Sequence, residues 1–315
     1  MPRVEDEDCG GMQGMNSGRS IAERIFQNEA DPAFRRRAIW IGSNLWDRFL
    51  GQPYSLLDIG CGRGFYFPLY HSLGAEIVGV ERDAEPLSTA RLQAERFGAV
   101  VQDVSADHLP FPDESFDAVV MSELLEHLPM PIAALKEARR VLRPEGLLLI
   151  TVPNANYPFL WDPINWLLER TLGTPIRTGL LSGIWANHER LYDHELLLGE
   201  VEAAGFDIGQ VVNHTHYCMP FVHNIVYGLG KPLLEKRLLP QNWAQSAERG
   251  TGDSSALHRF NPVSAGIRLI HWFDRKNKDA ESETISTLNI CVMATPVQLI
   301  AEPQSELSGI PPAIS

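Results

Sequence analysis

The segment from Leu56 to Tyr66, LLDIGCGRGFY, combines one acidic residue with three closely spaced glycines. An apolar run ends at Asp58, and Gly60, Gly62 and Gly64 follow at every second position. Glycines permit positive φ angles and let a ligand lie against bare backbone, so the pattern predicts a tight binding turn between a strand and a helix. Open α/β sheets bind their ligands at the carboxyl ends of strands, where this turn would lie.

Two further carboxylates follow apolar runs of the same kind. Glu81 ends AEIVGVE (75–81), and Asp103 ends AVVQD (99–103). A carboxylate about 20 residues after a glycine turn can accept hydrogen bonds from both hydroxyls of a ribose, and Asp103 could receive the amino group of an adenine. The rival pattern for dinucleotides is G-x-G-x-x-G, whereas this chain has D-x-G-x-G-x-G. Asp58 would repel a pyrophosphate and attract an ammonium group, so we expect a cationic nucleoside as the ligand.

Apolar runs and helical patterns alternate around these residues. Short apolar runs separated by helices indicate βαβ units, and hence a parallel sheet covered on both faces. The runs are 55–60, 75–81, 99–103, 117–123 and 146–152, and the helical patterns between them are about 64–74, 85–97 and 131–142. A helix over 31–50, capped by Asp31, precedes them, and a helix over 193–204, a strand over 206–212, an amphipathic helix over 263–275 and a strand over 287–295 follow.

These motifs, in this order, resemble those of the class I S-adenosylmethionine-dependent methyltransferases. The resemblance covers roughly Ser55 to Phe206 through LLDIGCGRG, VGVE, VVQDVSADHLPFPDESFDAVVMSELLEHL and RVLRPEGLLLITVPN, with the last strand as a further match. Within that family the chain is most similar to small-molecule O-methyltransferases of the ubiquinone-biosynthesis type. The resemblance implies a doubly wound, Rossmann-like α/β fold with seven strands, mostly parallel, and an antiparallel last strand at 287–295. Glu81 stands where the family more often has Asp.

The resemblance also implies S-adenosyl-L-methionine as the cofactor and assigns residues to it. Asp58, Gly60 and Gly62 would line its methionine end, Glu81 its ribose and Asp103 its adenine. The remaining residues that we expect at the cofactor are Cys61, Gly64, Val104 and Ser122.

Methyl transfer displaces a neutral thioether, so positioning the reactants is the main requirement and an oxygen or nitrogen acceptor can also need a general base. His127, at the end of ELLEHL, is the first candidate, and His188 in WANHERLY is the second. Either histidine could instead be structural, His127 by packing in its turn and His188 as a surface residue.

Glu123, Glu126 and His127, together with His188, also suggest a metal site. An oxygen-rich set of this kind suits a hard cation such as Mg²⁺ better than zinc. One glutamate after the fourth strand is, however, common in metal-free relatives. We therefore expect no metal, and Mg²⁺ remains the alternative.

The chain divides into a disordered arm (1–20), one domain (21–295) and a disordered tail (296–315). Within the domain, the proline- and tryptophan-rich segment 153–190 predicts a packed lid that forms a wall of the acceptor pocket. Residues 217–280 form an insertion before the last strand. Its apolar part, 217–239, could be an interfacial segment that touches a membrane, or it could pack on the protein itself or in a dimer.

Composition excludes several classes of protein. The 315 residues are 44% hydrophobic and 21% charged, values typical of a chain with a packed core. The net charge of −13 argues against a nucleic-acid binder, because phosphates need clustered cations. Four separated cysteines with no C-x-x-C pair predict free thiols in a reducing compartment. No apolar run is long enough to span a membrane and the acidic run 5–8 is unlike a secretory signal, so we expect a cytoplasmic protein.

The leading functional hypothesis is methylation of a small, apolar or aromatic metabolite. One alternative is methylation of RNA or protein, and another is a binding module that has kept the fold without turnover. The sequence predicts no oligomeric state.

Overall fold

The computed structural model describes residues 17–179, 181–222, 261–277 and 286–298, with single positions between 225 and 243. Several expectations fall elsewhere: residues 1–16 of the arm, most of the apolar segment 217–239, nearly all of the insertion from 240 to 260 and the tail from 299 lie outside the described residues. Helix α2 (Gly18–Ile25) begins inside the stretch expected to be disordered, because the Ser17 side chain accepts a hydrogen bond from the backbone N–H of Ser20 and caps it.

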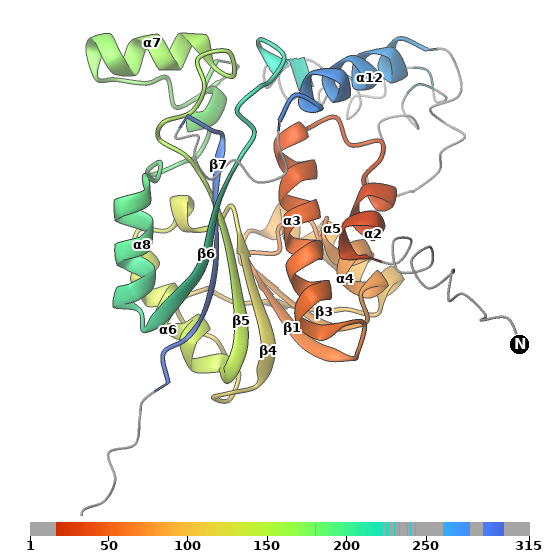
Figure 1. The fold of residues 1–315 in the computed structure, drawn as a ribbon, viewed down its shortest axis with the longest axis vertical. Helices are drawn as coiled ribbons and strands as arrows, with labels where there is room; N and C mark the ends of the chain where they lie inside the picture. The colour runs from red at the N-terminus through yellow and green to blue at the C-terminus, as the bar shows by residue number, and fades with distance from the viewer. Residues whose placement is uncertain are drawn as a thin grey trace, which may run out of the picture.

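The centre of the molecule is a seven-stranded sheet with strand order β3-β2-β1-β4-β5-β7-β6 (Figure 1). Its first five strands pair in parallel, and β7 pairs antiparallel with both β5 and β6. The strands are β1 (Tyr54–Ile59), β2 (Ala75–Glu81), β3 (Val100–Asp103), β4 (Phe116–Ser122), β5 (Leu142–Pro153), β6 (Phe206–His214) and β7 (Asn289–Pro296). The predicted doubly wound fold with an antiparallel last strand is confirmed.

Helices cover both faces of the sheet (Figure 1). One face carries α2, α3 (Pro32–Phe49), α4 (Phe67–Ser72) and α5 (Ala84–Phe97), and the other carries α6 (Pro131–Val141) and α8 (His194–Ala203). A core cluster lies on each face, and strands such as β4 alternate between them, with Val119 in one cluster and Val120 in the other. This double burial explains why the strand sequences are continuously apolar.

Local capping explains where the helices near the sheet edge begin. Asp31 Oδ1 accepts hydrogen bonds from the backbone N–H groups of Ala33 and Phe34, which confirms the predicted N-cap of α3. The helix expected over about 64–74 is shorter, because α4 begins at Phe67. Gly64 precedes it at a positive φ of 73°, a conformation that a right-handed helix cannot contain.

The segment 153–190 is packed, and it contains a helix that its prolines did not suggest. Helix α7 (Pro163–Leu172) begins at a proline, which is favourable at the first helical position, and Asp162 caps it. A 3₁₀ turn, η2 (Gly183–Trp185), follows. Tyr157 and Trp161 pack in a third core cluster with Ile270 of α12 (Pro262–Asp274). The lid is therefore fixed to the C-terminal part of the domain.

Among the described helices, none combines the length and apolar character needed to cross a bilayer.

Candidate functional site

The three glycines form the turn that the sequence predicts. Gly60, Gly62 and Gly64 have φ angles of 71°, 54° and 73°. A Cβ atom at Gly60 would lie 2.6 Å from Leu124 Cδ1, so packing also requires glycine there. A Cβ at Gly62 would meet nothing within 4 Å. The backbone at Gly62 therefore faces open space, as a surface for a ligand would.

Glu81 ties this turn to the end of β2. Its Oε2 atom accepts a hydrogen bond of 3.0 Å from the Gly62 N–H. Its Oε1 atom accepts bonds of 2.8 Å from the N–H groups of Arg82 and Asp83. Asp103 is the register partner of Glu81 on β3, and its side chain is exposed. Both carboxylates thus lie at the same edge of the sheet as the glycine turn, and the Oε2 atom of Glu81, which accepts one hydrogen bond, retains a lone pair for a ligand hydroxyl.

Asp58 is a buried acid with an unsatisfied oxygen. Its side chain is 2% exposed, and Oδ2 has no hydrogen-bond partner among the described residues. Burial raises the pKa of Asp58 to about 8, and the nearby negative charge of Glu81 adds to the rise. The Tyr70 hydroxyl lowers the pKa of Asp58 and so offsets part of this rise, although the hydroxyl forms no hydrogen bond of good geometry. A ligand ammonium group beside Asp58 would supply the missing partner.

The remaining residues expected at the cofactor lie nearby but differ in surroundings. The Cys61 thiol is buried against β2, since a Cβ at Gly79 would lie 2.9 Å from its Sγ. Burial raises the pKa of this thiol, so it is not a nucleophile at neutral pH. Val104 packs against the core. Ser122 Oγ lies 3.2 Å from the Tyr66 hydroxyl and 2.9 Å from Thr151 Oγ1, within hydrogen-bonding distance of both.

Glu123 lies in a polar network that the sequence did not reveal. Its carboxylate accepts hydrogen bonds from Thr151 Oγ1 (3.0 Å) and from Asn289 Nδ2 (3.1 and 3.2 Å). Arg37 Nη1 lies 3.4 Å from Glu123 Oε2, and it donates to Asn289 Oδ1 at 3.2 Å. The partners come from α3, β5 and β7. Only the three-dimensional fold brings them together, so no local motif could have found Arg37 or Asn289.

Glu126 and the two candidate histidines form a separate cluster. Glu126 is fully buried, with its Oε1 atom 3.8 Å from His127 Nε2 and 4.0 Å from His188 Nε2. The rings of His127 and His188 are 4.7 Å apart, at an angle of 70°. Burial, reinforced by the charge of Glu123, raises the pKa of Glu126 well above its usual value. The structure therefore brings both predicted histidines to one buried carboxylate.

The orientation of His127 determines which nitrogen faces this cluster. Its Nδ1 donates a hydrogen bond of 2.9 Å to the Asn187 carbonyl, which leaves Nε2 as the acceptor in the neutral ring. One ligand atom from each of Glu126, His127 and His188 lies within 4.8 Å of the others, a spacing that could hold a metal ion. This set has two nitrogens and one oxygen, so it suits a transition-metal ion better than Mg²⁺. Glu123, which we expected in the same set, is instead held by Arg37, Asn289 and Thr151.

A cavity of about 190 Å³ lies between the end of β5, the lid and the start of α3. Its apolar wall comes mainly from the lid and from β5, and its polar side chains include members of both clusters. The apolar lining includes Pro153, Trp161, Ile184 and Leu288, and the polar lining includes Arg37, Glu123, His188 and Asn289. An apolar pocket with a few convergent polar groups is the usual form of a small-molecule site.

Comparison with known proteins agrees with this geometry. Residues 57–150 match the family described as a methyltransferase domain, a stretch that contains the glycine turn, Glu81, Asp103 and Glu126. A ubiquinone biosynthesis O-methyltransferase of Cereibacter sphaeroides is 36% identical over 118 residues, which cover 35% of this chain and 48% of that protein. A malonyl-[acyl-carrier protein] O-methyltransferase of Yersinia pestis is 31% identical over 105 residues, covering 32% of this chain and 39% of that protein. The chain thus spans about half the length, or less, of these curated relatives.

A solved structure extends the similarity in fold to most of the chain. A suspected sarcosine dimethylglycine methyltransferase from Galdieria sulphuraria superposes with a TM-score of 0.51 at 15% identity, covering 84% of this chain and 86% of that one. Residues 57–150 thus match a methyltransferase domain, and the strand order over most of the chain is that of the Rossmann-like methyltransferase fold. The residues fit the family's cofactor, because Asp58 offers an unpaired buried oxygen and the backbone at Gly62 is open.

Proposed function

We propose that this protein transfers a methyl group from S-adenosyl-L-methionine to a small metabolite with an apolar or aromatic body. The observation that carries the proposal is the unpaired Oδ2 of Asp58 beside the open turn at Gly62. A buried carboxylate without a partner is costly, and a cationic ligand removes that cost. No other buried acid among the described residues combines this state with a glycine turn at a strand end.

The protein side chains have distinct tasks in binding the cofactor, which supplies an electrophilic methyl group when bound. Asp58 would pair with the ammonium of the methionine moiety, and the Gly60–Gly64 backbone would lie along it. Glu81 would accept the ribose hydroxyls, while its bond from the Gly62 N–H keeps the carboxylate and the turn in one geometry. Asp103, on the neighbouring strand, would accept the adenine amino group. This arrangement would hold the cofactor in one orientation for transfer.

The cavity size and lining support a small acceptor. A dry cavity of roughly 150 Å³ holds a benzene molecule, so about 190 Å³ accommodates one substituted ring. Trp161, Ile184 and Leu288 would contact its apolar faces, and Arg37, Glu123 or Asn289 would bind a polar substituent. The first relatives are O-methyltransferases by name, and the cavity reaches His188, which could take a proton from a hydroxyl.

His127 and His188 would activate the acceptor, and both lie beside the buried carboxyl group of Glu126. The cluster places one carboxyl oxygen of Glu126 within 4.0 Å of both Nε2 atoms, so this side chain would help to orient the two rings. A positioned general base contributes typically about 10²–10⁴-fold to a rate. The same three donors could hold a divalent cation that binds the acceptor oxygen directly, and the metal test below separates the two cases.

The test uses the full chain with S-adenosylmethionine labelled in the methyl group and a panel of hydroxylated aromatic compounds. We expect label in an organic-extractable product and release of S-adenosylhomocysteine. Label in a precipitable fraction after addition of RNA or protein would favour a macromolecular acceptor instead. Tight S-adenosylhomocysteine binding without transfer to any compound class would favour the non-catalytic binding module.

A further inference from the structure

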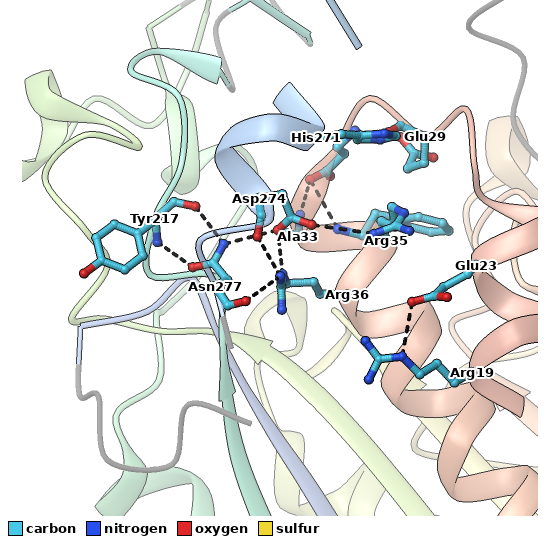
Figure 2. Close-up of polar contacts among 12 residues, drawn as sticks. Arg19, Glu23, Glu29, Ala33, Arg35, Arg36, Tyr217, His271, Asp274 and Asn277 are labelled. Atoms are coloured by element: carbon cyan, nitrogen blue, oxygen red, sulfur yellow. Dashed lines mark hydrogen bonds and ion pairs between the residues drawn. The ribbon is translucent and has the colours of Figure 1, made fainter. Parts of the chain in front are cut away.

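Helix α12 is held firmly on its inner side. Asp274 is 4% exposed, and its Oδ1 atom accepts a hydrogen bond of 2.5 Å from Arg36 Nε (Figure 2). Arg35 Nη1 forms an ion pair of 3.6 Å with Oδ2 of the same carboxylate. The Nε2 atom of His271 lies 2.8 Å from the Glu29 carbonyl, to which it donates a hydrogen bond. Ile267 and Ile270 are buried on the same face. The ion pairs fix which side of α12 faces the protein.

Asn277, just beyond α12, adds a second attachment. Its side chain bonds both ways to the Tyr217 backbone, accepting from the N–H at 2.7 Å and donating to the carbonyl at 2.8 Å (Figure 2). The helix is therefore tied to α3 at one side and to the 217–222 segment at the other. Its outer face cannot turn inward without breaking these contacts.

The outer face of α12 is nevertheless apolar. Leu269 is 49% exposed and Trp272 is 48% exposed, and these two lie one turn apart on the side opposite Ile267 and Asp274. Helix α7 lies at the same end of the molecule (Figure 1) and exposes Leu167 and Leu172. Phe221, between them in sequence, is 45% exposed. Exposed large apolar side chains gathered at one end of a molecule are typical of an interaction site.

The charges on this surface have one sign. We define the α7–α12 surface by residues 155–179, 181, 217–222 and 261–277. Within those ranges Asp162 and Asp274 are buried and Glu169 is half-buried, where it accepts a hydrogen bond from the Tyr157 hydroxyl. The charged side chains that are exposed in these ranges are all cations: Arg170, Arg177, Arg268, Arg275 and Lys276. A chain with a net charge of −13 thus presents positive charge beside these exposed apolar side chains.

We infer that the α7–α12 surface docks on a lipid bilayer that contains anionic headgroups. Leu269 and Trp272 enter the headgroup region, and Arg268, Arg275 and Lys276 contact the lipid phosphates beside them. An interfacial helix combines these features: a large aromatic residue and a leucine on one face, with Arg and Lys at its borders. The Lys276 ammonium lies 4.8 Å from the Trp272 ring, so it can cover the indole in water and move to a headgroup on docking.

The charge pattern favours an anionic bilayer over a second copy of this chain or a nucleic acid. A second copy of the chain would place these cations against each other across a two-fold interface, which is unfavourable. A polyanion such as RNA would use the cations but leave Leu269 and Trp272 without a role. An anionic bilayer uses both. The docking does not depend on methyl transfer, because no residue of the glycine turn belongs to this surface.

The experiment is co-sedimentation of the full chain with sucrose-loaded vesicles, either phosphatidylcholine alone or phosphatidylcholine with a quarter phosphatidylglycerol. We expect sedimentation with the anionic vesicles and little with the neutral ones. The Arg268→Gln/Arg275→Gln/Lys276→Gln variant should bind the anionic vesicles about 100-fold more weakly, at about fivefold for each cation near the surface. The Leu269→Ser/Trp272→Ser variant should lose roughly tenfold or more.

Two matched controls keep the result specific. Leu92→Ser removes a leucine that is 67% exposed on α5, and Arg91→Gln removes an exposed cation beside it; neither should change vesicle binding. Wild-type binding to neither vesicle, or unchanged binding by the α12 variants, would overturn the inference. A larger fall in melting temperature for Leu269→Ser/Trp272→Ser than for Leu92→Ser would also overturn the inference, because Leu269 and Trp272 would then be packed within the protein. A doubled molar mass in solution would overturn the inference in favour of a dimer interface between two copies of this chain.

The affinity of the same variants for S-adenosylhomocysteine should equal that of the wild type. This result separates the vesicle test from the test of the proposed function.

Discussion

The rings of His127 and His188 lie 4.7 Å apart, although one follows β4 and the other belongs to the lid. Their Nε2 atoms share Glu126 Oε1, which is fully buried. This contact joins the end of β4 to the lid segment, which also lines the cavity. It is the structural basis for placing acceptor activation at the cluster rather than at the glycine turn.

Replacing His127 with alanine should separate turnover from cofactor binding. We expect turnover to fall by about 10²-fold or more while S-adenosylhomocysteine affinity changes less than threefold, because His127 faces Glu126 and not the glycine turn. Steady-state rates and calorimetric titrations measure the two quantities. His71→Ala on α4 is the control, since this histidine lies away from the cluster. Unchanged turnover in His127→Ala would make His127 a structural residue.

Gly62→Ala should weaken cofactor binding without a packing defect. The new methyl group meets no atom within 4 Å of the protein, but it would occupy the space proposed for the ligand. Gly98→Ala is a matched control, since Gly98 also has a positive φ of 67° and open surroundings, at the end of α5. Both variants should lose about 1 kcal/mol of stability from backbone strain. Equal S-adenosylhomocysteine affinities in the two variants would contradict a ligand at Gly62.

The pH dependence of stability should report on Asp58. Its pKa of about 8 in the fold lies above the ordinary value of 3.8, so the folded state holds a proton that the unfolded state releases between these values. The carboxyl therefore costs no stability below pH 4, and the penalty grows as the pH rises towards 8. Asp58→Asn removes this penalty. We expect the variant to gain stability over the wild type progressively from pH 5 to pH 8.5 in urea titrations, and a constant difference would refute the burial of an acid.

Metal uptake tests the second use of the histidine cluster. Two imidazole nitrogens and one carboxylate oxygen within 4.8 Å should bind Mn²⁺ or Zn²⁺ more tightly than Mg²⁺. We expect one equivalent by calorimetry on chelator-treated protein, abolished in Glu126→Gln and retained in Glu123→Gln. No uptake by the wild type, or uptake that is unchanged in Glu126→Gln, would contradict a metal site at this cluster.

Sequence patterns sufficed for features that are local in the chain. Asp58 and Glu81 lie at the carboxyl ends of their strands, and the glycines come directly after β1. Parallel pairing of the two strands is therefore enough to bring these residues to one edge of the sheet. Arg37 and Asn289 could not be found in this way, because they reach Glu123 from α3 and β7. Helix α7 was missed because prolines were read as breakers, whereas Pro163 starts the helix. The pairing of His188 with Glu126 depends on how the lid folds back, which spacing does not encode.

The most direct test of the account is a calorimetric titration of S-adenosylhomocysteine into the wild type and into Asp58→Asn. We expect one site per chain in the wild type and a loss of affinity of roughly 100-fold in the variant, since an ion pair with a buried carboxylate is broken. Equal affinity in the two proteins, or no binding by the wild type, would contradict it.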